Sequence, residues 1–320
     1  MSCARRADTS PKPQAPPPFE FLGAWGDKGE GPGKLDEPVT FAVDTLGNVF
    51  FADPAAGFVH KFESKGTPLL SFEDTRLHHA SGIAVDSGGA IYVADAERGA
   101  VLIFFPDGTF LRAIQIPSQP HFSGLLGIAV DDAGNLYVPD PARSRITKFN
   151  ARGRLVKSWA VPKNAAADEP PSAIAAAEDG SVFVAFAKTG RIEKYSSDGM
   201  SITSWSAADN LGGDSHSITG FAVAGQFVFT LTISPPQIRV WTLDGQHKLD
   251  ADLGEQLGAI SAPPGAAVTS GGLQVEPAPV AAPLPALQIA VAPHTELLVF
   301  DPSAPRMFRF RMHLETKELK

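Results

Sequence analysis

Three histidines occupy similar places in the chain, and imidazole is the side chain that most often binds zinc-type ions. They stand three, six and four residues before a glycine that opens an apolar segment, and they are His79, His121 and His216. If the loops that carry them meet on one face, three imidazoles could hold a divalent ion with one position open. An open position would support a hydrolase or lyase reaction. The alternative is a set of loop histidines that are exposed or bonded to backbone, and His78 competes with its neighbour for the first place.

A run of basic residues without any acid extends from residue 141 to residue 163. The members that form a candidate basic patch are Arg143, Arg145, Lys148, Arg152, Arg154 and Lys157. Such a patch could bind RNA or dock an acidic protein or an anionic surface. Alternatively it is a solvated face, because Arg145 and Lys148 fall in an outer-strand pattern. The whole chain has 27 Lys and Arg against 35 Asp and Glu, and its net charge of −8 argues against a general nucleic-acid binder.

Two sets of aspartates recur in step with a repeated pattern. The sets are Asp44, Asp86 and Asp131, and Asp53, Asp95 and Asp140. Aspartate accepts hydrogen bonds from the backbone amides of turns, so each is predicted to stabilise a local turn. A catalytic acid would be expected once or twice rather than in every copy.

Other sequence motifs for catalysis or cofactor binding are missing. The glycine-rich segment 26–33 is not a phosphate-binding loop, because Lys34 is followed by Leu35 and no helical pattern follows. No Gly-x-Ser-x-Gly motif of a nucleophilic serine occurs in the sequence. We therefore expect no cofactor, with a divalent metal at the three histidines as the alternative.

The only cysteine, Cys3, lies in a proline-rich segment, residues 1–18, that is predicted to be a disordered tether. A cysteine followed by a polar tether and a folded domain resembles the mature start of a bacterial lipoprotein, so Cys3 is a candidate for lipid attachment. The body of the chain has no cysteine, which fits an oxidising, extracytoplasmic compartment. An incidental cysteine in a cytoplasmic protein is the alternative.

The elements that must position these residues come from an internal repeat. Glycines at 47, 89, 134, 180 and 225 follow short apolar segments at spacings of 42, 45, 46 and 45 residues. Each copy predicts about four short strands, and a sixth copy has Thr295 at the glycine position. A period of this length with four strands per unit is typical of a β-propeller, in which stacked blades bury each other's apolar faces. The sequence therefore predicts an all-β, six-bladed propeller of four-stranded antiparallel blades.

The ends of the chain are predicted to close this ring. The segment 19–25 has the pattern of an outermost strand but precedes the first blade, whereas the sixth blade lacks such a strand. We expect the N-terminal strand to complete the sixth blade, which removes an exposed sheet edge. The propeller would then span 19–311, followed by a tail, 312–320, with one long Pro/Ala-rich loop at about 252–286 between the fifth and sixth blades.

The repeat itself resembles the NHL repeat. The resemblance rests on Gly26 to Pro38, on Phe41-Ala-Val-Asp44, and on Val-Ala-Asp95 and Val-Pro-Asp140 in the next two blades. It implies a six-bladed propeller of the NHL/TolB-like type and says little of function. Some NHL enzymes, the amidating lyases, hold a channel metal with three histidines, so the resemblance to them is one of arrangement. Lactonase-like propellers need polar inner strands, and only Gln288 is polar among the inner strands predicted here.

These observations favour a non-enzymatic, monomeric binding module that presents the loops of one propeller face to a protein or a small ligand. The long 252–286 loop is the first candidate for specificity. The alternative is a metal-dependent lyase or hydrolase at the channel mouth. A second alternative is RNA or acidic-partner binding through the basic third blade. A membrane would be contacted only through a lipid on Cys3.

Overall fold

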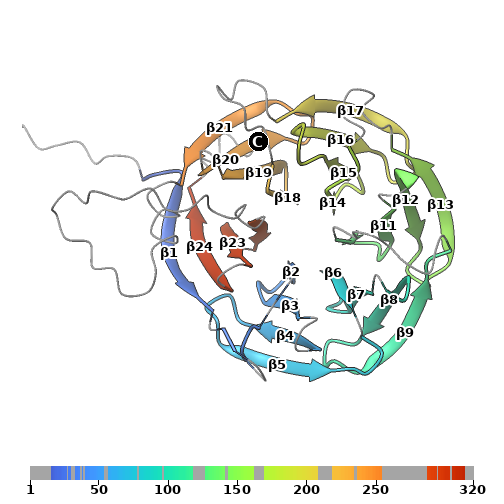
Figure 1. The fold of residues 1–320 in the computed structure, drawn as a ribbon. Helices are drawn as coiled ribbons and strands as arrows, with labels where there is room; N and C mark the ends of the chain where they lie inside the picture. Colours follow the sequence, from blue (N-terminus) through green and yellow to red (C-terminus); the bar gives the residue numbers. More distant parts are fainter. Residues whose placement is uncertain are drawn as a thin grey trace, which may run out of the picture.

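Each copy of the repeat folds as one four-stranded antiparallel sheet, and the six sheets are arranged as blades around a central channel (Figure 1). The structure is a computed structural model. It describes residues 16–26, 28–29, 33–36, 38, 40–53, 57–77, 79–95, 97–117, 127–140, 143–161, 169–207, 218–233, 236–253, 287–293, 295–302 and 305–313. Both the fold class and the number of blades are as the sequence predicts.

Within each blade the strands run in order from the channel to the rim. Blades one and two contain β2 (Thr40–Val43), β3 (Val49–Asp53), β4 (Phe58–Phe62), β5 (Pro68–Glu73), β6 (Ala80–Val85), β7 (Ile91–Asp95), β8 (Ala100–Phe104) and β9 (Phe110–Gln115). Blades three and four contain β10 (Ala129–Val130), β11 (Leu136–Asp140), β12 (Arg145–Phe149), β13 (Leu155–Ala160), β14 (Ala173–Ala176), β15 (Val182–Ala185), β16 (Arg191–Tyr195) and β17 (Ser201–Ser206). Blades five and six contain β18 (Gly220–Ala224), β19 (Phe227–Ile233), β20 (Pro236–Thr242), β21 (His247–Asp252), β22 (Gln288–Ala292), β23 (Glu296–Asp301), β24 (Arg306–Met312) and β1 (Phe19–Trp25).

The ring is closed by the N-terminal strand, as predicted. Strand β1 pairs antiparallel with β24, with Phe19 opposite Met312 and Trp25 opposite Met307. The N–H of His313 donates to the carbonyl oxygen of Pro18 at 2.8 Å, at the place where the other blades have a hairpin turn. The two ends of the chain thereby complete one sheet.

The core lies between blades rather than within one. The second strand of each blade is the most deeply buried; all five residues of β3, β7 and β11 are buried. Apolar side chains from neighbouring blades form shared clusters, for example the one that joins Val49 and Phe51 of β3 to Leu298 and Phe300 of β23. A blade is therefore stable only with its neighbours.

The outer ends of the blades are joined by a repeated contact between a large side chain and a glycine. The side chain sits on the outermost strand of one blade, and the glycine lies in the outer hairpin of the next. A Cβ atom on the glycine would lie within 3.0 Å of the facing side chain in each of five pairs. The pairs are Trp25/Gly66, Phe72/Gly108, Ile114/Gly153, Trp159/Gly199 and Trp205/Gly245. The three tryptophans of this set therefore pack between neighbouring blades.

The turn between the first two strands of each blade also has a fixed conformation. Gly47, Gly89, Gly134, Gly180 and Gly225 all have positive φ angles, between 54° and 84°. Thr295, the residue matched to them in the sixth copy, has a φ of 63°. The alignment of the degenerate sixth copy is thus supported by its backbone, even though threonine is disfavoured in that conformation.

The close contact with tryptophan can be separated experimentally from the need for a positive φ. Gly199 has a φ of 75°, and a Cβ there would lie 2.4 Å from Trp159 Cδ2. Gly57 has a φ of 69°, but a Cβ there would meet nothing within 4 Å. We predict that Gly57→Ala costs about 1 kcal/mol of unfolding free energy, from backbone strain. Gly199→Ala should cost about 1–3 kcal/mol more, from overpacking. Equal costs in urea unfolding would show that the tryptophan contact is not tight.

Candidate functional site

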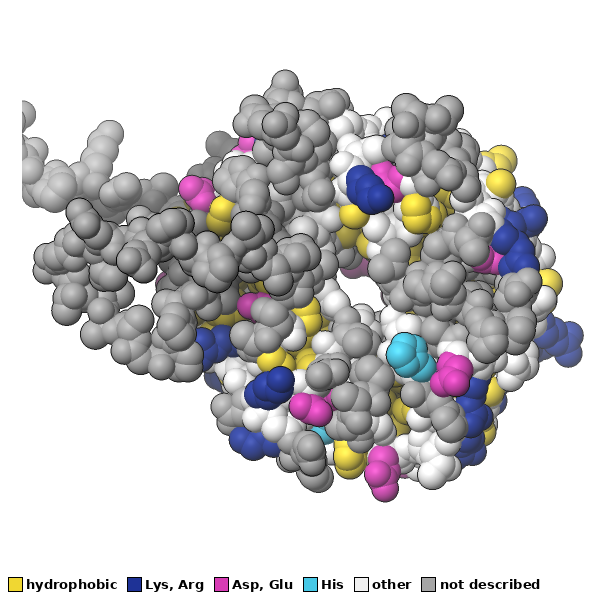
Figure 2. Space-filling model, in the orientation of Figure 1, with side chains coloured by type: hydrophobic (Ala, Val, Ile, Leu, Met, Phe, Trp, Pro, Cys, Tyr) yellow, Lys and Arg dark blue, Asp and Glu magenta, His cyan; other side chains and the backbone are white. Residues whose placement is uncertain are grey.

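A cavity of about 450 Å³ opens at one mouth of the central channel. It is lined by the first residues of the inner strands and by the residues just before them, so every blade contributes. In Figure 2 the centre of the ring is hollowed on the face in view. The polar lining residues are Thr40, His79, Ser81, Ser172, Thr219 and Gln288. No Lys, Arg, Asp or Glu lines this cavity among the described residues.

Three of these hydroxyls occupy equivalent positions in blades two, four and five. Each donates its proton to a carbonyl of the second strand of its own blade: Ser81 to Ala94 at 3.3 Å, Ser172 to Ala185 at 2.9 Å and Thr219 to Leu231 at 3.2 Å. Sequence reasoning missed them because it began each inner strand one or two residues later. A signal was present, since a Ser or Thr stands two residues before Ile-Ala or Phe-Ala in all three copies.

Of the three candidate metal-binding histidines, the structure describes only His79. His79 is exposed and lines the channel-mouth cavity, as the propeller prediction requires. His121 and His216 lie outside the described residues. No group of three His, Cys, Asp or Glu side chains suited to a metal occurs among the residues that the structure describes. The three-histidine metal site stays a prediction.

The opposite mouth of the channel has a different character. A cavity of about 510 Å³ there is lined by carboxylates from four turns, among them Asp44, Asp86 and Asp131, and by several valines and alanines. Each of these aspartates accepts backbone N–H groups of its own turn; Asp44 Oδ1, for example, accepts those of Leu46 and Asn48 at 2.9 and 2.8 Å. The prediction that they stabilise turns is confirmed.

The second set of aspartates also bonds to backbone, at the far ends of the second strands. Asp53 accepts the N–H of Asp36 at 2.7 Å, and Asp95 and Asp140 accept N–H groups three residues further along the chain.

The first set of aspartates, at the opposite mouth, also accepts hydrogen bonds from tyrosine hydroxyls. Tyr92 donates to Asp86 at 3.1 Å, and burial together with this carboxylate raises the pKa of Tyr92 to about 12. The tyrosine therefore stays neutral and structural at ordinary pH.

The candidate basic patch lies at the rim, where Figure 2 shows Lys and Arg side chains gathered beside β9 and β13. Several of its members have structural partners. Arg143 pairs with Asp140 at 2.9 Å, and Arg145 donates to the Ser158 hydroxyl at 3.1 Å. Lys157 reaches the Asp198 carbonyl of the next blade at 2.6 Å. The patch is therefore partly a set of links within and between blades.

Lys148 differs from the expectation of a solvated face. It is buried, and its ammonium donates to the Ser197 carbonyl of blade four at 2.9 Å. The outer-strand pattern did not indicate this, because the partner comes from a neighbouring blade. Arg152 and Arg154 instead lie in a turn, where their backbone N–H groups donate to the Asn150 side chain.

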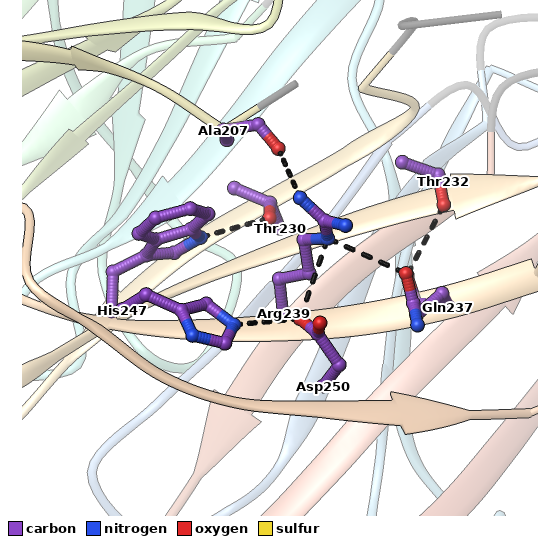
Figure 3. A network of polar contacts seen from close by, with 8 residues as sticks. Ala207, Thr230, Thr232, Gln237, Arg239, His247 and Asp250 are labelled. Atoms are coloured by element: carbon purple, nitrogen blue, oxygen red, sulfur yellow. Dashed lines mark hydrogen bonds and ion pairs between the residues drawn. The ribbon is translucent and has the colours of Figure 1, made fainter. Parts of the chain in front are cut away.

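A polar network joins the outer parts of blades four and five (Figure 3). The buried Arg239 guanidinium donates to the Ala207 carbonyl at 3.1 Å and pairs with Asp250 at 3.3 Å. His247 bonds the same carboxylate at 2.8 Å. A shallow groove of about 400 Å³ lies beside these residues. Because the arginine and the carboxylate neutralise each other and hold a backbone carbonyl, the network serves blade packing.

A serine and a histidine also meet in blade one. The Ser71 hydroxyl lies 2.9 Å from His60 Nδ1 and accepts the N–H of Gly33 at 3.3 Å. His60 is fully buried, and its Nε2 has no hydrogen-bond partner among the described residues. Neither residue lines the channel-mouth cavity. The composition is that of a nucleophile and a base, but the histidine is enclosed in the blade, so the pair is part of the core.

Comparison with known proteins supports the fold and the repeat. The NHL repeat family matches residues 77–104, which include most of the second blade. This protein is a six-bladed β-propeller whose second blade matches the NHL repeat. No curated protein sequence matches the chain significantly.

Solved propellers resemble the whole ring. A streptogramin B lyase is 15% identical over 87% of this chain and 94% of its own, with a TM-score of 0.58. Virginiamycin B lyase from Staphylococcus aureus is 12% identical over 85% of this chain and 79% of its own, with a TM-score of 0.55. Raptor from Chaetomium thermophilum is 12% identical over 84% of this chain, with a TM-score of 0.56. The match covers 22% of the Raptor chain. At these identities the comparison shows that the propeller shares its fold with two lyases and with Raptor, and it does not show a reaction or a ligand.

Two further predictions fall outside the described residues. They are the lipid-attachment candidate Cys3 and the greater part of the Pro/Ala-rich loop, residues 254–286. The described residues contain no helix with the length and apolar character needed to cross a membrane.

The buried His60 makes the stability of the propeller depend on pH. Burial lowers the pKa of His60, and the Asp53 carboxylate opposes this only in part. The unfolded chain therefore binds the proton more readily, so stability is lost as pH falls below about 6.5, by at most about 1.4 kcal/mol per pH unit. Blade two has Leu102 and Ala113 at the places of His60 and Ser71. We predict that His60→Leu/Ser71→Ala removes this acid sensitivity in urea unfolding, whereas parallel pH profiles for both proteins would contradict the assignment.

Proposed function

We propose that the NHL propeller is a non-enzymatic binding module that holds its ligand at the channel mouth lined by Thr40, Ser81, Ser172, Thr219 and Gln288. The observation that carries this proposal is the cavity of about 450 Å³ formed there by all six blades. Its size suits a small ligand or a protruding side chain of a protein. NHL propellers generally mediate protein interactions, which agrees with this function.

The chemistry of the mouth supports binding over catalysis. Its described polar groups are hydroxyls, one amide and the exposed His79. Hydroxyls that already bond to strand carbonyls can orient a ligand, and among the described residues none of the three is hydrogen-bonded to a base that would activate it as a nucleophile. The loops around the mouth would then supply specificity, the long 252–286 loop first among them.

A metal-dependent lyase is the second candidate, favoured by the position of His79 at the mouth and by the lyases among the structural neighbours. It requires His121 and His216 to converge on His79 within coordination distance of one ion. The protein would act outside the cytoplasm if Cys3 carries a lipid.

Filling the mouth tests the binding function. Ser172→Trp would place an indole in the channel-mouth cavity, and Ser87→Trp would do the same in the opposite cavity. Ligand-observed NMR on the full chain with a library of small polar molecules provides the measurement. We predict that ligands of the native protein lose at least tenfold in affinity with Ser172→Trp and keep it with Ser87→Trp.

Gln288→Trp fills the same mouth from another blade, so the test does not depend on correct folding of Ser172→Trp alone. The thermal unfolding of all three variants should remain cooperative. Ligands that bind equally well to both mouth-filled variants, or the absence of any ligand for the native protein, would overturn the proposed site.

A further inference from the structure

The hydroxyls of the channel mouth are oriented so that they present acceptors rather than donors to the cavity. Each of these hydroxyls donates its one proton to a carbonyl of the adjacent strand; they belong to Ser81, Ser172 and Thr219. A hydroxyl oxygen that donates its proton elsewhere retains two lone pairs that can only accept. Three of the six blades therefore offer fixed acceptors at equivalent positions around the channel.

The orientation is held by the backbone. The N–H groups of Ser172 and Thr219 donate to the same two carbonyls, Ala185 and Leu231, at 2.8 Å. Each side chain thus continues the hydrogen bonding of its strand. Turning a hydroxyl toward a ligand as a donor would break its bond to the carbonyl, which costs free energy.

The charge distribution favours a positive ligand. No Lys or Arg lines either channel cavity among the described residues. The opposite mouth carries Asp44, Asp86, Asp131, Asp132 and Glu178, and in the part of the chain that the structure describes only Asp44 forms an ion pair, with Lys61 at 3.5 Å. Charges of one sign at the end of a channel with low-dielectric walls produce a potential that extends along it.

We infer that the channel mouth binds an organic cation with several N–H donors, of the class of alkyl diamines and polyamines. Ammonium groups would donate to the hydroxyl oxygens of blades two, four and five. The apolar side chains beside them, Ile83, Ile174 and Ile289, would contact the alkyl chain. This inference rests on the proposed binding function and adds the chemical class of the ligand.

The class can be tested with molecules of one shape and different polar ends. Putrescine carries an ammonium at each end, butanediol a hydroxyl and succinate a carboxylate. In isothermal titration calorimetry of the full chain at low salt, putrescine should bind at least tenfold more tightly than butanediol, and succinate should not bind. Added salt should weaken the binding of putrescine. Butanediol that binds as tightly as putrescine would overturn the inference.

The hydroxyls can be removed without loss of backbone hydrogen bonds. Ser172→Ala and Thr219→Val should each lower putrescine affinity about tenfold, because a hydrogen bond to a charged group is lost. Thr203→Val and Ser204→Ala, on the outer strand β17, make the same chemical changes far from the channel and should have no effect. Unchanged affinity in the two mouth variants would overturn the inference.

The failure of this inference can be told apart from failure of the binding function. If putrescine does not bind but Ser172→Trp still abolishes binding of other small molecules, the ligand class is wrong and the channel-mouth site stands. If no ligand of the native protein responds to Ser172→Trp, the binding site itself is wrong.

Discussion

At five of the six junctions between blades, a large side chain of one outer strand lies against a hairpin glycine of the following blade, as Trp159 does on Gly199 and Trp205 on Gly245. The arrangement of the channel depends on this contact, because the inner ends of the blades can converge only if the outer ends are held at a constant spacing. Polar links reinforce the same junctions: Trp25 donates to the Ser64 carbonyl at 2.8 Å, and Lys148 to that of Ser197 at 2.9 Å. At the junction of blades five and six, where the outer hairpin is replaced by the chain ends, Ala251 takes the place of the large side chain.

The different side chains at the two mouths of the channel follow from the two ends of one repeated inner strand. The carboxyl-side end of each inner strand enters a turn that needs an aspartate to hold its N–H groups, so carboxylates collect at one mouth. The other end starts after a loop, where a Ser or Thr can bond to the neighbouring strand without disturbing a turn. Among the described residues, one mouth of the channel is lined by carboxylates and the other by hydroxyls without Lys, Arg, Asp or Glu. The hydroxyl-lined mouth is the better place for a ligand, because the oxygens of Ser81, Ser172 and Thr219 keep lone pairs that can accept hydrogen bonds.

Much of this architecture could be predicted from the sequence, because strand patterns and turn glycines are local features. The position of Thr295 in the degenerate sixth copy and the pairing of β1 with β24 both followed from the repeat. The burial of Lys148 could not, because its partner belongs to another blade. The hydroxyls of Ser172 and Thr219 were missed for a different reason: they precede the apolar core of the strand, where the repeat pattern is weakest. The loops that carry His121 and His216 differ in length, so sequence spacing alone does not determine whether these side chains converge.

In the proposed function the channel mouth is a binding site without a catalytic metal, and the metal content of the full-length, untagged protein provides the decisive test. Elemental mass spectrometry should be performed on the native protein and on His79→Ala, purified without chelators. The account predicts zinc, cobalt and calcium well below one ion per chain in both proteins. About one ion per chain in the native protein, lost in His79→Ala, would contradict it and would favour a metal-dependent lyase or hydrolase at the same mouth.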